Sequence, residues 1–500
     1  MADPIILAID QGTTGTTVLL VDRGGAVIAR GYAAVTQHYP RPGWVEHNPR
    51  QIWQTVLDAA TQALAAGGHP PIAAIGITNQ RETTVVWDRR TGKPVAPAIV
   101  WQCRRTAPMC RALQEMGLAA LFEARTGLLL DAYFSGPKIA WLLEHVPGLR
   151  ARAADGEVLF GTVDSWLLWQ LTGGAVHATD VTNASRTLLL DIDAGKWSPE
   201  LLATLGVPPQ MVPCVVPTSG VAGETVSTGA IPAGVPVASL AGDQQAALFG
   251  QACFVAGAAK TTYGTGCFLL LNTGLDRARS FHRLLSTVAW EIGPAARLRY
   301  ALEGSVFAGG AVVQWLRDEL GLIATAGETV ALAASVPDTQ GVTFVPAFTG
   351  LGAPHWDPDA RGTIVGLTRG AGRAHLVRAG LEAIAHQVAD VVAAMEADAG
   401  APLVEMKVDG GAAANDFLMQ YQADLLGRPV LRPVNLETTA LGAATLAGLA
   451  VGVWSGTDEL AAHWRLDRRF EPGMSSADRR QHRETWQNAV ERARSRPASG

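Results

Sequence analysis

The chain has 500 residues, of which 48% are hydrophobic and 17% are charged, and this composition is typical of a globular protein rather than a disordered one. One hydrophobic core rarely organises so many residues, so we expect two large domains. The formal net charge of −5 argues against a general binder of nucleic acid or of anionic membranes.

Cysteine usage and apolar stretches exclude further classes of protein. The five cysteines are scattered and form no CxxC motif, so neither a disulfide framework nor a structural zinc site is expected. The N-terminus has no basic run, and the longest apolar region, residues 439–454, is short for a membrane span. We therefore expect a cytoplasmic protein with no nucleic-acid partner and no membrane insertion.

The first 80 residues are predicted to form three strands joined by turns, then a helix and a further strand. Asn48 is a good N-cap for the helix, and Pro49 suits its first position. Apolar residues recur every four positions along the helix and predict one buried face. The predicted strands span residues 5–9, 16–21, 26–35 and 72–78.

A similar order of elements begins again near residue 258. Strands at 258–263 and 267–271 enclose the tight turn Gly264-Thr265-Gly266. Two halves that open in the same way suggest an old duplication and a cleft between two α/β domains, which we place at residues 1–250 and 251–500. Further predicted elements are strands at 284–290, 298–302 and 404–408, helices at 307–320 and 415–426, and a tail after residue 473 that is helical and then frayed.

The turn from Asp10 to Thr16 is rich in glycine and threonine. Such a turn presents backbone N–H groups and hydroxyls toward one point, and nests of this kind bind phosphate. Asp10, at the end of the strand, is placed to hold Mg²⁺ directly or through water. No Gly-Lys-Ser/Thr follows, so this is not a Walker A loop, and taken alone it is better explained as an ordinary hairpin turn.

A second turn of this kind, Gly264 to Gly266, favours phosphate binding over an ordinary hairpin turn. One phosphate-binding turn in each half would clamp a nucleotide polyphosphate from both sides. Gly410 and Gly411 follow another strand and let the backbone approach a flat ligand such as a nucleoside. Asn415 lies at the start of the next helix. Together these elements predict a nucleotide site.

Asp243 follows an apolar strand (235–240), and we expect it to be the N-cap of a helix at 244–249. This position favours the carboxylate form. An ionised carboxylate can accept a hydroxyl proton while a phosphoryl group is transferred to that hydroxyl. An ordinary capping role is the alternative, and it does not conflict with the chemical one.

Arg81 and Glu82 are adjacent charges at the end of an apolar strand. The simplest interpretation is a surface ion pair. Alternatively, the arginine donates to hydroxyl oxygens and the glutamate accepts from hydroxyl protons, so that the two together recognise a vicinal diol.

Long sequence runs over the whole chain carry a specific resemblance to a known family. They lie at residues 42–47, 76–84, 99–105, 241–250, 263–268 and 362–376. These runs resemble those of the FGGY carbohydrate kinases of the actin-like ATPase superfamily, and most of all the members that act on glycerol. The resemblance implies two actin-like (ribonuclease-H-like) α/β domains around an interdomain cleft. It also implies phosphorylation of glycerol to sn-glycerol 3-phosphate with ATP and Mg²⁺.

The resemblance also assigns roles to single residues. Asp243 is implied as the general base, and Asp10 as the residue that organises Mg²⁺. The implied glycerol-binding residues are Arg81, Glu82, Trp101, Tyr133, Asp243, Gln244 and Phe268. For each of these aromatics the alternative is simple core packing. The implied ATP-binding residues are Thr13, Thr14, Gly15, Thr265, Gly310, Gln314, Gly411 and Asn415.

One position departs from the family pattern. Many members carry Ser-Ser-Arg after the first Gly-Thr-Thr, and that arginine contacts phosphate, whereas here the run is Gly15-Thr16-Thr17. The strength of nucleotide binding therefore stays open. Two alternatives to the implied activity also remain: an FGGY kinase of another polyol or ketose, and a non-kinase actin-like ATPase that drives partner binding. We expect a homo-oligomer, either a dimer or a tetramer.

Overall fold

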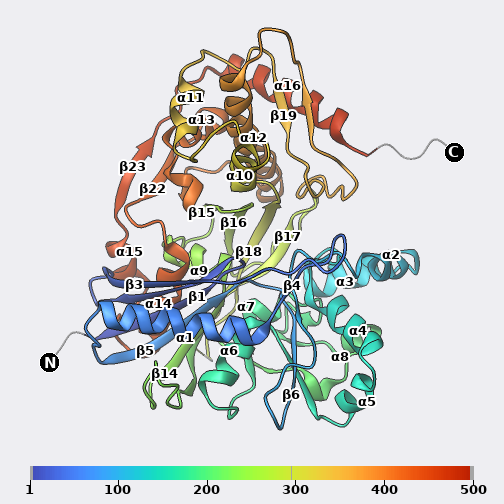
Figure 1. The fold of residues 1–500 in the computed structure, drawn as a ribbon, viewed down its shortest axis with the longest axis vertical. Helices are drawn as coiled ribbons and strands as arrows, with labels where there is room; N and C mark the ends of the chain where they lie inside the picture. The colour runs from blue at the N-terminus through green and yellow to red at the C-terminus, as the bar shows by residue number, and fades with distance from the viewer. Residues whose placement is uncertain (1–3, 294, 496–500) are drawn as a thin grey trace.

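The computed structural model describes residues 4–293 and 295–495, and two large sheets organise it (Figure 1). In spatial order, the first sheet contains β13 (Ser219–Glu224), β14 (Pro236–Gly242), β5 (Ile72–Asn79), β1 (Ile5–Gln11), β2 (Gly15–Val21) and β3 (Val27–Ala34). The second contains β17 (Leu285–Trp290), β18 (Arg299–Val306), β16 (Cys267–Gly274), β15 (Ala259–Tyr263), β21 (Met406–Asp409), β22 (Val430–Pro433) and β23 (Leu466–Phe470). The α/β class is confirmed.

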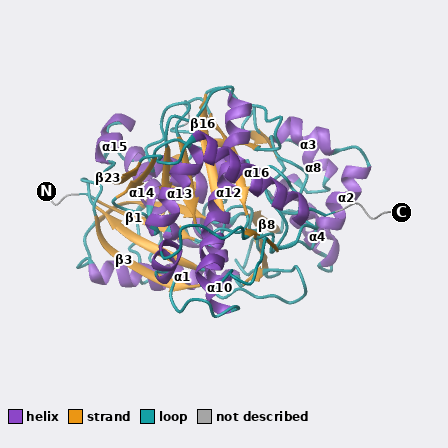
Figure 2. Cartoon of the chain, turned by 90° about the horizontal axis from the view of Figure 1, so that it is seen from above, coloured by secondary structure: helices purple, strands orange, loops and turns teal. Residues whose placement is uncertain are grey.

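Helices surround the two sheets. They are α1 (Pro49–Ala66), α2 (Ala107–Glu115), α3 (Ala119–Thr126), α4 (Ser135–His145), α5 (Leu149–Ala154), α6 (Val163–Leu171), α7 (Val181–Ala184), α8 (Pro199–Thr204), α9 (Asp243–Gly250), α10 (Gly310–Asp318), α11 (Glu328–Ala334), α12 (Arg373–Ala399), α13 (Asp416–Leu426), α14 (Thr438–Ala450), α15 (Thr457–His463) and α16 (Ser476–Ala493). Helices α2, α3, α4 and α8 gather at one end of the molecule, and α15 lies at the other (Figures 1 and 2). None of the described helices is long and apolar enough to cross a membrane.

Short elements complete the fold. Two-stranded sheets pair β4 (Glu46–His47) with β7 (Ala98–Ile99), β6 (Val85–Asp88) with β8 (Val158–Gly161), β9 (Ala178–Asp180) with β12 (Cys214–Val216), β10 (Leu190–Asp191) with β11 (Lys196–Trp197), and β19 (Thr343–Val345) with β20 (Thr363–Val365). Two 3₁₀ turns, η1 and η2, span Pro209–Met211 and Gly411–Ala414.

The sequence signals for α1 are confirmed. Asn48 is the N-cap, and its side chain accepts a hydrogen bond from the Arg50 N–H. Pro49 is the first helical residue, and the apolar positions from Ile52 to Leu64 face the core. The predicted helix after residue 473 is α16, whereas the fraying expected beyond it falls mainly on residues 496–500, outside the described residues.

Parallel pairing brings several chain segments to one edge of the first sheet. Strand β5 pairs in parallel with both β1 and β14, and Asn79 lies opposite Gln11 on one side and Gly242 on the other. The carboxyl ends of these three strands therefore coincide, as at ligand sites of open α/β sheets. In the second sheet, β15 and β21 are also parallel, with Thr262 opposite Asp409.

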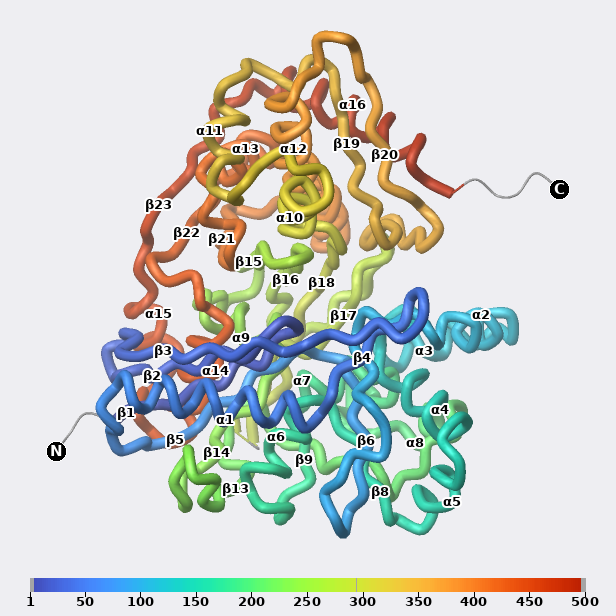
Figure 3. The backbone as a smooth tube through the Cα atoms, viewed as in Figure 1, coloured from blue at the N-terminus to red at the C-terminus, as the bar shows by residue number. Residues whose placement is uncertain are grey.

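Helix α14 belongs to the second half of the sequence but packs against the first sheet. It contacts β1, β5, β14 and α9 (Figures 1 and 3). A Cβ atom at Gly442 would overlap the backbone carbonyl of Ala246, so only glycine allows this close approach. The apolar region 439–454 is thus mostly a buried helix. The division of the chain at residue 250 stays a prediction, and α14 lies beyond it.

Candidate active site

Arg81 and Glu82 follow β5 and are buried, with 2% and 1% of their surfaces exposed. The interpretation as a surface ion pair is therefore wrong. Glu82 has a φ of 60°, in the left-handed region that non-glycine residues rarely adopt. Such strain persists only where the surroundings impose it, and it is concentrated at functional sites.

Four buried charges form a closed network. Arg81 donates from Nη1 and Nη2 to the two carboxylate oxygens of Glu303, at 2.5 and 2.9 Å. Arg186 donates to Glu82 at 2.7 Å and to Glu303 at 3.0 Å. We call Arg81, Glu82, Arg186 and Glu303 the buried charge network. It balances two cations with two anions, as burial requires, and Glu303 brings β18 of the second sheet into contact with the end of β5.

The two carboxylates of this network differ in their pKa. Burial raises the pKa of Glu303, but Arg186 and Arg81 outweigh burial and lower it to about 2. At Glu82, burial dominates over Arg186 and Arg81, and its pKa is raised. The difference follows from the contacts, because Glu303 accepts hydrogen bonds from both guanidinium groups and Glu82 only from Arg186.

Asp243 lies beside this network, and its Oδ1 is 3.1 Å from Nε of Arg81. Its predicted role as N-cap of α9 is wrong: Gly242 is the N-cap, and Asp243 is the first helical residue. The carboxylate forms an ion pair with Arg81 and accepts a hydrogen bond from the adjacent Gln244 N–H at 2.8 Å. Burial raises the pKa of Asp243, against the opposing influence of Arg81 and Lys260. A carboxylate of raised pKa, while ionised, is a stronger proton acceptor.

The two glutamines after Asp243 have different contacts. Gln245 accepts a hydrogen bond from Arg81 at 3.2 Å, whereas Gln244, the predicted glycerol-binding residue, accepts one from Nζ of Lys260 at 2.5 Å. Gln244 is nevertheless next to Asp243 in the first turn of α9.

The three predicted aromatic residues are in mutual contact. The Trp101 ring meets Tyr133 at 5.6 Å and Phe268 at 5.9 Å, both edge to face. The Trp101 indole N–H also donates to the Thr13 hydroxyl at 2.9 Å. Trp101 therefore links the three aromatic residues to the first Gly/Thr turn. Phe268 is on β16, a strand of the second hairpin, so that hairpin also contacts Trp101.

The two Gly/Thr turns are tight hairpins whose threonine tips are exposed. In the first, the Gly12 N–H donates to the Gly15 carbonyl at 2.9 Å, and Thr14 lies at the tip. In the second, the Gly264 N–H donates to the Gly266 carbonyl at 2.9 Å, and Thr265 lies at the tip.

The start of α10 is hydrogen-bonded to the second turn. The Gly310 N–H donates to the Gly264 carbonyl at 2.8 Å. Gln314, one turn further along this helix, is exposed. Thr17, which replaces the family arginine, is buried in β2 opposite Asp10.

The loop after β21 lies against the second turn. Gly410 has a φ of 83°, and its α-carbon packs on the backbone of Tyr263. Gly411 is exposed with open space beside it. Asn415 is the N-cap of α13: it accepts the Leu418 N–H and donates to Thr329, each at 3.0 Å. Asn415 thus uses one N–H and one lone pair of its amide within the protein, and the second N–H and the second lone pair stay available to a ligand.

Asp10 provides a test of the predicted magnesium ion. Burial, with Asp243 and Glu437 as neighbouring carboxylates, raises the pKa of Asp10 well above its ordinary value. A divalent cation would relieve this repulsion. Mg²⁺ commonly binds through one or two carboxylates together with water and substrate phosphates. The residues fit that pattern, although the described part of the chain contains no cluster of three metal-ligating side chains.

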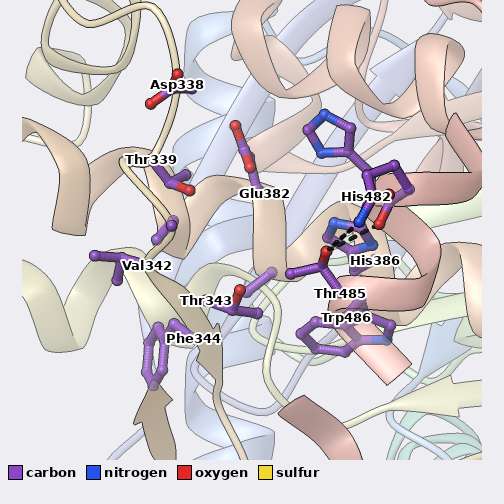
Figure 4. A pocket seen from close by; sticks show the side chains of 14 residues that line it. Asp338, Thr339, Val342, Thr343, Phe344, Glu382, His386, His482, Thr485 and Trp486 are labelled. Carbon is purple, nitrogen blue, oxygen red and sulfur yellow. Dashed lines mark hydrogen bonds between the residues drawn. The ribbon is translucent and has the colours of Figure 1, made fainter. Parts of the chain in front are cut away.

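A cavity of about 200 Å³ lies in the second half, away from all these residues (Figure 4). Val342, Glu382, His386 and Trp486 are among its lining residues. His386 stacks on Trp486, and burial lowers its pKa to about 3. None of the predicted site residues lines this cavity.

Sequence interpretation missed three charged residues of the site. Glu303 lies in the middle of β18 and Lys260 within β15, so a charged residue inside a predicted strand was an available signal for both. Arg186 follows the short helix α7 and has no comparable signal in a single sequence.

Comparisons with known proteins identify the family of the chain. The model of the FGGY family of carbohydrate kinases, N-terminal domain, matches residues 5–250, and that of the C-terminal domain matches residues 259–451. A glycerol kinase of Aromatoleum aromaticum is 60% identical over 98% of both chains. Glycerol kinase 2 of Thermotoga maritima is 56% identical, again over 98% of both.

Solved structures extend the comparison. The crystal structure of Plasmodium falciparum glycerol kinase with ADP superposes with a TM-score of 0.91, at 35% identity over 99% of both chains. A gluconate kinase of Lactobacillus acidophilus, at 21% identity and a TM-score of 0.85, shares the fold. The predicted fold of two actin-like α/β domains is confirmed, and the chain belongs to the FGGY family of carbohydrate kinases.

Proposed function

We propose that this chain transfers the γ-phosphoryl group of ATP to glycerol and releases sn-glycerol 3-phosphate and ADP. The observation that carries the proposal is the placement of Asp243 against Arg81 of the buried charge network, at the edge of the first sheet where the first Gly/Thr turn and its Trp101 contact also lie. The similarity to proteins named glycerol kinases over nearly the whole chain supports glycerol as the acceptor.

The acceptor is held by complementary polar and apolar groups. Arg81 donates to glycerol hydroxyl oxygens and Glu82 accepts from hydroxyl protons, while Trp101 and Phe268 cover the carbon edge. Gln244 and Tyr133 add hydrogen bonds. Because the buried charge network holds Arg81 and Glu82 before glycerol arrives, little ordering is left for the binding step.

Asp243 accepts the proton of the attacking hydroxyl as the new O–P bond forms and the bond to the ADP oxygen breaks. Arg81, 3.1 Å away, keeps the carboxylate ionised until that moment. Positioning and charge neutralisation supply most of the catalysis in phosphoryl transfer.

The nucleotide is held mainly by backbone groups. Thr13, Thr14 and Gly15 contact the phosphates from one side and Thr265 from the other, while Gly310, Gln314, Gly411 and Asn415 line the remaining site. Asp10 would hold Mg²⁺, which would supply neutralisation of phosphate charge when bound. We also propose a cytoplasmic location and a homo-oligomer, dimer or tetramer, which light scattering of the purified protein would test.

The test of the function is ADP formation from ATP and Mg²⁺ across a panel of glycerol, erythritol, xylulose, ribulose and gluconate. We expect kcat/KM to be highest for glycerol and turnover without an acceptor to be very low. A higher kcat/KM for a pentulose would make the chain a ketose kinase of the same family. ATP turnover that does not depend on any acceptor would favour the non-kinase ATPase.

A further inference from the structure

Two lysines, Lys138 and Lys260, lie fully buried beside predicted site residues, and Lys260 is the one that contacts both halves of the molecule. Lys260, on β15, has no exposed surface. Its Nζ donates to Oε1 of Gln244 at 2.5 Å, to the Thr262 hydroxyl at 2.8 Å and to the Phe268 carbonyl at 3.5 Å. All three ammonium protons thus have an acceptor, and Gln244 belongs to α9 on the first sheet. The hydrogen bond from Lys260 to Gln244 therefore joins the two halves, and Gln244 directly follows Asp243 in the sequence.

The groups around this ammonium come from four elements. Asp243 at the start of α9, Asp409 at the end of β21 and Glu303 on β18 attract it, and Arg81 after β5 repels it. Asp409 is itself buried, and its Oδ1 has no hydrogen-bond partner among the residues that the structure describes. A buried charge is costly unless it is paired and hydrogen-bonded, and Lys260 has both carboxylate neighbours and three acceptors.

We propose that Lys260 is a positioning residue for phosphoryl transfer, whose ammonium fixes Gln244 against the acceptor from the opposite half of the molecule. This inference rests on the proposed function. Lys260 acts through its neighbours. The hydrogen bond to Gln244 orients that side chain, and the positive charge lowers the pKa of Asp243 against the effect of burial.

The proposal has a pH signature. Burial lowers the pKa of Lys260 to about 8, with Arg81 adding to the effect and Asp409, Asp243 and Glu303 opposing it. Lys260 is therefore charged at neutral pH and loses its proton as the pH rises through about 8. The kcat of the wild-type protein should decline in that range, because the neutral amine has only two N–H donors and no longer holds Gln244 with a charge-assisted hydrogen bond.

The experiment compares Lys260→Met and Lys260→Arg with a matched control. Lys407 lies directly opposite Lys260 on the neighbouring strand β21, but its Nζ donates to the Gln251 carbonyl at 2.8 Å and lies over the Trp464 ring. Lys407→Met should keep kcat within about twofold, as expected of a residue outside the site. For each variant we would measure kcat, KM for glycerol and the pH profile of kcat/KM.

We expect Lys260→Met to lower kcat by about 10- to 100-fold. The Kd for glycerol, measured by tryptophan fluorescence, should rise by less than about tenfold, because only the Gln244 contact loses its orientation. The acidic limb of its kcat/KM profile should move to higher pH, because the pKa of Asp243 rises when the cation is lost. Lys260→Arg should restore part of the kcat and have no decline near pH 8, since a guanidinium stays charged.

Two outcomes separate the inference from the function on which it rests. If the wild-type protein shows no glycerol-dependent ADP formation, the proposed function fails whatever Lys260 does. If the wild-type protein is active but Lys260→Met keeps its kcat and both pH limbs, the inference fails alone. Should Lys260→Met not fold, as judged by thermal unfolding, an unchanged decline near pH 8 in Lys260→Arg would overturn the inference equally.

Discussion

The polyol side and the nucleotide side of the proposed site are built in contrasting ways. On the polyol side, the recognition groups Arg81 and Glu82 are locked in the buried charge network with Arg186 and Glu303, each at most 2% exposed. On the nucleotide side, Thr14, Thr265, Gln314 and Gly411 are exposed and uncharged, and tight backbone turns present them.

This contrast shows where the site is rigid and where it tolerates change. Removing one member of a balanced set of buried charges leaves its partner uncompensated, so the polyol side should be sensitive to single substitutions. Backbone N–H groups bind phosphate whatever side chain they carry, so the nucleotide side should be more tolerant. Thr17, in place of a family arginine, is consistent with that tolerance.

The largest effect is expected at Glu303, which contacts both arginines of the network. Glu303→Gln removes a buried anion that balances two cations, and we expect the free energy of unfolding to fall by about 3–5 kcal/mol. Urea denaturation would measure it. The matched control is Glu200→Gln, because Glu200 forms an exposed pair with Arg125 and should contribute less than about 1 kcal/mol. If Glu303→Gln and Glu200→Gln lowered the free energy of unfolding equally, the polyol side would not be unusually sensitive to substitution.

Arg81→Ala comes next, because it leaves substrate hydroxyls unpaired and removes one of the two guanidinium partners of Glu303 and the cation next to Asp243. We expect a loss of ~2–4 kcal/mol in transition-state stabilisation, read from kcat/KM for glycerol. ATP binding in the absence of glycerol should barely change. If glycerol affinity and kcat both survive, Arg81 does not recognise the diol.

Asp243→Asn tests the proton-accepting role of Asp243 without changing the shape of the site. The substitution keeps the shape of the side chain and removes the proton acceptor, so kcat should fall by about 10²-fold while glycerol affinity is largely kept. Steady-state kinetics with a parallel fluorescence titration would measure both. Near-normal turnover in a folded protein would exclude Asp243 as the base.

The smallest effect is expected on the nucleotide side. Thr265→Ala removes one exposed hydroxyl but leaves the backbone of the second turn intact, so KM for ATP should rise by less than about tenfold, with KM for glycerol unchanged. A loss as large as that of Arg81→Ala would show that side chains, rather than backbone groups, carry phosphate binding.

The sequence was most informative where the signal is local. The Gly/Thr turns, the capped start of α1 and the strands leading to Arg81 and Asp243 were predictable from neighbouring residues. The buried charge network was not, because Arg81 and Glu303 are 222 positions apart and a single sequence does not reveal such pairs. The predicted cap at Asp243 failed for the same reason, since Arg81, a distant residue, holds its carboxylate.

Helix α14 has a consequence for how the protein is synthesised. The ribosome completes the first sheet and α9 roughly 190 residues before α14, a delay on the order of 10–40 s at about 5–20 residues per second. During that interval the face of Ile6, Ala8 and Leu19, which α14 later covers, is left without its partner. The nascent N-terminal half is therefore an unfinished domain, and it matures only when the chain is nearly complete.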